Sequence, residues 1–162
     1  MTWDVWAELR RRPHVTLEWA DLGGDGGRID RHAGGWTIIT LDYRLMQRER
    51  RAALAHELVH EERGILFDAD TPVALIDKEE SAVRREVAWR LCPPVELARR
   101  IRHTVDNGQP VTAQNVCEWF DVPVDVALEA MRSHELAASR TRHPTARAAL
   151  HRNHDGLTES AA

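Results

Sequence analysis

Residues 45–64 read LMQRERRAALAHELVHEERG, and the pattern of this stretch predicts one long helix over Leu45–Arg63. Gly64 directly follows three charged residues and is expected to end the helix, because glycine readily adopts the left-handed conformation of a helix C-terminus. Small or apolar residues stand among the charged ones: Ala52, Ala53, Ala55 and Val59. A purely solvated helix would not need them, so we expect this helix to pack against the rest of the chain.

The same helix carries the motif His56-Glu57-Leu58-Val59-His60. Positions four residues apart lie on one helix face, so the two imidazoles can bind a single zinc ion with bonds of about 2.0–2.1 Å. Glu57 would lie beside the ion without binding it, where it can accept a proton from the attacking water. The motif therefore predicts a zinc metallopeptidase with one Zn²⁺ per chain. The alternative interpretation is two histidines on the surface of an amphipathic helix.

A catalytic zinc ion needs a third protein ligand and an open fourth position. The pattern HExxHxxGxxH does not fit, because Arg63 and Leu66 occupy the positions of its glycine and third ligand. Glu80 is the predicted ligand, because it shares a helix face with the apolar residues at three, seven and eleven positions further on, Val83, Val87 and Leu91. Glu79 and Glu86 share their side with charged neighbours and are expected to be solvated. The alternative for Glu80 is a charge near a helix N-terminus, favoured by the helix dipole.

A peptidase also needs a donor for the oxyanion that develops in the transition state. Tyr43, His103 and Arg84 are the candidates in this sequence. For His103, a place on the polar face of a helix over residues 95–105 is the favoured alternative.

The rest of the chain predicts strands before the motif helix and helices after it. The expected elements are a helix over 2–11, strands over 15–22, 28–31 and 34–42, a connection over 65–76, helices over 77–91 and 95–105, and two short helices within 112–134. We expect a core over 1–106, a helical hairpin packed on it over 107–137, and a disordered tail over 138–162.

The net charge, the apolar runs and the cysteines of the chain indicate which classes of function it can have. A net charge of −4 gives no overall attraction to nucleic acid or to an anionic membrane. No apolar run reaches the roughly 18 residues that a membrane span needs, and the N-terminal charges follow the apolar residues, the reverse of a signal peptide. Cys92 and Cys117 fit no metal or redox pattern and are expected to be free, buried thiols. These features predict a cytoplasmic protein.

Two segments resemble the ImmA/IrrE family of metallo-endopeptidases: RRAALAHELVHEERG (50–64) and EESAVRREVAWRLCPP (79–94). In the second segment Glu80 takes the place of the family's glutamate, and Leu91-Cys92-Pro93 the place of its helix end. Val83 stands where the family often has alanine. The resemblance covers roughly residues 14–105, and the helical pair at 112–131 is also similar to one that often follows in the family.

The resemblance implies a small α+β, zincin-like domain, in which a short mixed sheet packs on the HExxH helix and a ligand-bearing helix. It also implies a regulatory peptidase whose protein substrate is a repressor-type regulator of a phage or mobile element.

Two other function classes compete with this interpretation. Residues 112–134 have the rhythm of a helix-turn-helix, but their second helix, VDVALEAMRSH, lacks the basic character of a DNA-recognition helix. An arginine-rich face at Arg99, Arg100 and Arg102 can instead bind an acidic protein partner. The second alternative is a zinc-binding module that is catalytically weak or inactive, against which the presence of Glu57 speaks. The sequence leaves the oligomeric state open.

Overall fold

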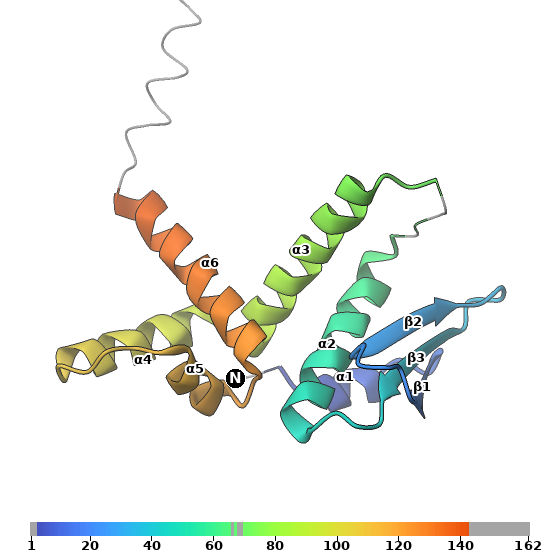
Figure 1. The fold of residues 1–162 in the computed structure, drawn as a ribbon, viewed down its shortest axis with the longest axis horizontal. Helices are drawn as coiled ribbons and strands as arrows, with labels where there is room; N and C mark the ends of the chain where they lie inside the picture. Colours follow the sequence, from blue (N-terminus) through green and yellow to red (C-terminus); the bar gives the residue numbers. More distant parts are fainter. Residues whose placement is uncertain (1–2, 66, 68–69, 143–162) are drawn as a thin grey trace, which may run out of the picture.

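The computed structural model describes residues 3–65, 67 and 70–142, and the motif helix is its central element (Figure 1). This helix, α2 (Gln47–Arg63), begins two residues later than predicted, where the Met46 N–H donates to the Glu49 carboxylate at 2.8 Å. Gly64 ends it as expected, with φ +64° and its own N–H bonded to the His60 carbonyl.

Three strands form a mixed sheet on one side of α2. They are β1 (Val15–Ala20), β2 (Gly27–Arg31) and β3 (Thr37–Asp42), in the order β1-β3-β2. β3 pairs with β1 in parallel and with β2 antiparallel. All three predicted strands are thus confirmed, including the short one near residues 28–31. β2 is an edge strand and lies along α2, which brings it to the side of the motif.

Buried apolar side chains surround α2 because the helix is covered by the sheet on one side and by other helices elsewhere. The short helix α1 (Val5–Arg10) also packs on it. Side chains with no exposed surface come from both α2 and the central strand: Ile39, Leu41, Leu54, Ala55, Leu58 and Val59. The expectation that the motif helix packs against the rest of the chain is confirmed.

The next helix, α3 (Val73–Leu91), lies against α2 on the side away from the sheet (Figure 1). It begins four residues earlier than the predicted start at Asp77, so part of the expected connection over 65–76 is helical. Pro72 directly precedes it, and proline favours helix starts because its φ is fixed near the helical value. Cys92 and Cys117 are both buried and form no disulfide, as predicted.

The remaining helices lie beyond α3, at the opposite end of the molecule from the sheet (Figure 1). They are α4 (Pro94–Asp106), α5 (Ala113–Phe120) and α6 (Val124–Arg142). α6 packs against α3, α4 and α5, so the predicted helical pair does contact the preceding helices. The described part of the chain thus has an α+β fold with a three-stranded sheet and six helices.

α6 is longer than predicted. The expected tail begins at residue 138, but the helix continues to Arg142. Glutamate, leucine, alanine and arginine recur from residue 135 onwards and have high helix propensity, which explains the extension. The rest of the predicted tail, residues 143–162, lies outside the described residues.

No described helix has both the length and the apolar character that a membrane span requires.

Candidate metal centre

His56 and His60 lie one turn apart on the face of α2 that is directed toward α3. Their Nε2 atoms are 3.0 Å apart and their ring centroids 4.7 Å apart. Both side chains are mostly buried but keep some exposed surface. Burial lowers the pKa of His56, and the nearby His60 lowers it further, while Glu80 acts in the opposite direction. A neutral imidazole is the form that binds metal, so this environment suits a ligand.

Glu80 reaches the same point from α3. Its Oε1 lies 2.9 Å from His60 Nε2, and its Oε2 lies 3.3 Å from His56 Nε2. The three side chains thus offer donor atoms that all lie within 4.8 Å of one another. Ligands at tetrahedral angles, with bonds near 2.0–2.1 Å, are about 3.3 Å apart. The observed separations match that geometry closely enough for the group to hold a metal ion.

Within the described residues, no other group of three or more histidine, cysteine, aspartate or glutamate side chains meets the same condition. Two imidazoles and one carboxylate form a donor set that suits first-row transition metals better than calcium or magnesium, which prefer oxygen ligands.

The Glu57 side chain projects from α2 toward Gly27 of the edge strand β2. Its residue is 6% exposed, and a methyl group placed on Gly27 would stand 2.9 Å from its Oε1. Burial first, and then the negative charge of Glu80, raise the pKa of Glu57 to about 7, with Arg31 opposing. The carboxylate is therefore close to the metal group, yet it is not one of the three converging donors.

Gly27 is a position next to Glu57 that the sequence analysis did not identify. Its backbone does not adopt a positive φ, so only the lack of a side chain explains why glycine suits this strand position. A glycine inside a strand signals a close approach of another group, and that signal was present in the sequence. The structure shows that the group close to Gly27 is the Glu57 side chain, which the sequence could not reveal.

The expectation that Glu79 is solvated is wrong. Its side chain is only 8% exposed, against 32% for Glu80, and it forms a two-point ion pair with Arg63 at the end of α2. The Arg63 guanidinium holds the pKa of Glu79 below its usual value. Glu86 is also not simply solvated, because it pairs with Arg90 at 2.7 Å. Sequence spacing placed Glu80 on the apolar face, but the neighbouring Glu79 is the more deeply buried of the two.

Tyr43 does not contact the metal group in the described structure. It follows β3, is 52% exposed, and its hydroxyl lies 3.5 Å from Asp21. Its carbonyl accepts a hydrogen bond from Arg50, which precedes His56 by six residues, or about 9 Å along a helix. The chain therefore places Tyr43 beside the first half of α2, whereas the ligands lie in the second half.

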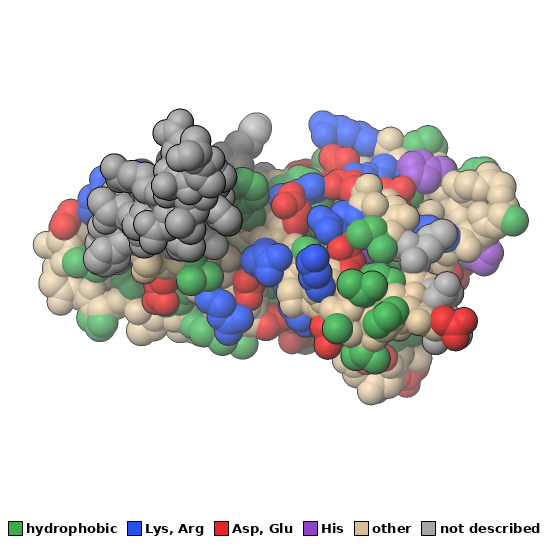
Figure 2. All heavy atoms as spheres, turned by 90° about the horizontal axis from the view of Figure 1, so that it is seen from above, with side chains coloured by type: hydrophobic (Ala, Val, Ile, Leu, Met, Phe, Trp, Pro, Cys, Tyr) green, Lys and Arg blue, Asp and Glu red, His purple; other side chains and the backbone are tan. Residues whose placement is uncertain are grey.

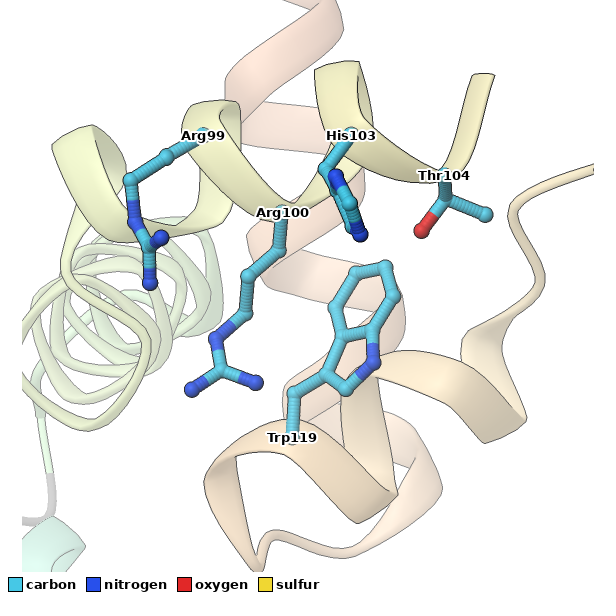
Figure 3. A pocket seen from close by; sticks show the side chains of 5 residues that line it. All are labelled: Arg99, Arg100, His103, Thr104 and Trp119. Carbon is cyan, nitrogen blue, oxygen red and sulfur yellow. The ribbon is translucent and has the colours of Figure 1, made fainter. Parts of the chain in front are cut away.

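His103 also lies elsewhere, in a different pocket. It projects from α4, which extends from the end of α3 away from α2 (Figure 1). There it helps to line a cavity of about 180 Å³ between α4 and α5, whose lining residues are Arg99, Arg100, His103, Thr104 and Trp119 (Figure 3). Arg84 differs from both other donor candidates, since its positive charge is close enough to lower the pKa of His56.

The arginine-rich face of α4 is partly neutralised. Arg99 and Arg100 both bind the Glu96 carboxylate, at 2.6 and 2.8 Å. Over the part of the molecular surface drawn in colour in Figure 2, basic and acidic side chains are interspersed and form no large patch of one sign. The pairing with Glu96 reduces the positive charge that Arg99 and Arg100 offer to an acidic partner or to nucleic acid.

Searches for related proteins gave no match: no protein-family model fits the chain, and no significantly similar curated protein or solved structure was found.

Proposed function

We propose that this protein is a zinc-dependent endopeptidase, in which His56, His60 and Glu80 hold one zinc ion and Glu57 is the general base. One observation carries the proposal: donor atoms of three side chains from two helices converge, with a buried carboxylate beside them. The N, N, O donor set leaves a fourth position for water or substrate, as in catalytic zinc sites.

The chemistry follows from what each group can do. When bound, zinc supplies Lewis acidity, polarising the scissile carbonyl and lowering the pKa of water. Glu57 accepts a proton from the attacking water while the water oxygen bonds to the carbonyl carbon. Glu57 then gives this proton to the amide nitrogen as the C–N bond breaks. Arg84, near His56, is the proposed donor to the developing oxyanion, in place of Tyr43 and His103.

Burial of Glu57 supports turnover over the alternative of a zinc-binding module without activity. A buried carboxylate destabilises the fold unless something compensates it, and a protein that only held metal would have no use for one at this position. The resemblance to the ImmA/IrrE family also supports the proposal, with the zincin-like arrangement and the repressor-type substrate that the resemblance implies. The cytoplasmic location belongs to the proposal on the composition of the sequence.

Metal analysis and one conservative variant test the proposal together. The purified protein should carry close to one zinc ion per chain, and Glu57→Gln should keep that zinc but lose proteolysis. The assay is co-expression with candidate repressors, in particular one encoded nearby, with Glu57→Gln as the control. Absence of zinc from the wild type, or undiminished cleavage by Glu57→Gln, would refute the assignment.

The choice of the third ligand has its own test. Glu80→Ala should lower zinc occupancy far more than Glu86→Ala, because Glu86 is on the same helix but pairs with Arg90. Equal occupancy in the two variants would show that Glu80 is not a ligand.

A further inference from the structure

The ion pair between Arg63 and Glu79 joins α2 to α3 directly beside the metal group. Arg63 is the last residue of α2, three residues after His60, and Glu79 immediately precedes Glu80. Both oxygens of Glu79 are bound, one by Arg63 Nε and the other by Nη2 at 2.7 Å. A planar guanidinium paired with a carboxylate in this two-point manner fixes direction as well as distance.

Only the carboxylate of this ion pair is buried, because the Arg63 side chain keeps 35% of its surface exposed. The Glu79 side chain is 8% exposed, and removing a carboxylate from water is unfavourable even when it is paired. An ion pair with one buried member contributes little net stability, so we explain this pair by the geometry that it specifies. The geometry here is the rotation and height of α3 relative to α2 at the level of Glu80.

Glu80 depends on that geometry. Its two oxygens must face His56 and His60, which belong to a different helix. We propose that Arg63 and Glu79 are positioning residues, whose ion pair holds α3 so that the Glu80 carboxylate faces the two histidines. This inference rests on the metal site of the proposed function but not on peptidase activity.

A second ion pair between the same helices provides a matched control. Arg90 of α3 binds Glu62 of α2 at 2.6 Å, and the two side chains are 30% and 28% exposed. Arg90 lies ten residues beyond Glu80, or about 15 Å along the helix axis. On α3, loss of this pair removes a contact far from Glu80, whereas its α2 partner Glu62 immediately precedes Arg63. Glu62 also retains Arg12 as a partner in an Arg90→Ala variant.

The experiment measures the zinc affinity of the full chain by competition with a chelator. Arg63→Ala and Glu79→Gln should each raise the Kd for zinc by roughly 10–100-fold, the usual effect of losing a group that orients a ligand. Arg90→Ala should leave the Kd unchanged. The exchanged pair Arg63→Glu/Glu79→Arg should recover most of the lost affinity, a result that a purely local packing role would not give.

Thermal unfolding of the metal-free forms separates affinity from stability. If Arg63→Ala does not fold, Glu79→Gln still gives the comparison, because it keeps the volume of the side chain. Wild-type affinity in both variants, or an equal loss in Arg90→Ala, would overturn the positioning role. A wild type that binds no zinc would instead overturn the proposed function, so the two failures are distinguishable.

Discussion

The metal group between α2 and α3 and the cavity between α4 and α5 both combine histidine with charged side chains, and they differ in how those charges are arranged. Between α2 and α3, two histidines and Glu80 come from separate helices and direct their donor atoms at one point. Between α4 and α5, His103 lines a cavity next to Arg99 and Arg100, whose charges are already bound by Glu96 one turn away. Residues of suitable type therefore form a candidate metal site only when their donor atoms converge on one point. Side chains whose charges are already paired with neighbours in the same helix do not form such a site.

The strongest test of this comparison replaces one histidine from each place. His56→Ala should abolish stoichiometric zinc binding and reduce proteolysis to background, because it removes one of the three proposed ligands. His103→Ala should retain zinc and activity, since His103 belongs to the other cavity. Elemental analysis and the cleavage assay measure both. Zinc loss in His103→Ala would mean that the two places are coupled and that the comparison fails.

A second test concerns the strand that confines Glu57. Gly27→Ala places a methyl group 2.9 Å from Glu57 Oε1, too close for the carboxylate to keep its position. We expect zinc to remain and kcat to fall by roughly 100-fold, since small displacements of a catalytic group are costly.

Gly26→Ala is the matched control for this variant. The added methyl group there meets only the Ala53 side chain, at 3.6 Å, which is an ordinary contact. Activity in Gly26→Ala should stay close to that of the wild type. Equal kcat values in the two variants would show that the room left by Gly27 has no role in catalysis.

The smallest effect is expected on the melting temperature, from the substitution Glu96→Gln in α4. Arg99 and Arg100 lower the pKa of Glu96 to about 2, from the usual 4.5 of a glutamate in water. A pKa that is lower in the folded state means that the ionised carboxylate stabilises the fold above pH 4.5, and that this contribution is lost as the pH falls toward 2.

Melting temperatures measured against pH test this expectation. Wild type should melt slightly higher than Glu96→Gln at pH 7, and the two curves should converge near pH 2. Because the group is exposed, the difference should be small. Zinc binding should not change in Glu96→Gln, which again distinguishes this region from the metal centre. A constant difference over the whole pH range would show that the ionisation of Glu96 is not its cause.

Local sequence predicted a large part of the fold. The motif helix, its end at Gly64 and the three strands follow from periodicity and from the conformational preference of glycine, which act over a few residues. The early start of α3 and the late end of α6 were missed, because helix ends depend on propensity differences that are small compared with packing. The zinc assignment and the family resemblance stay predictions.

The sequence by itself determined the pair of histidines, because four residues make one helical turn wherever the helix lies. It also favoured Glu80, by spacing along a second helix. Only the tertiary structure brought Glu80 to those histidines, left Tyr43 and His103 apart from them, and buried Glu79 against Arg63. The physical reason is that such contacts depend on how whole elements dock, and docking is set by side chains far apart in the chain. Gly27 against Glu57 is the clearest instance: the close approach exists only because the edge strand packs along α2.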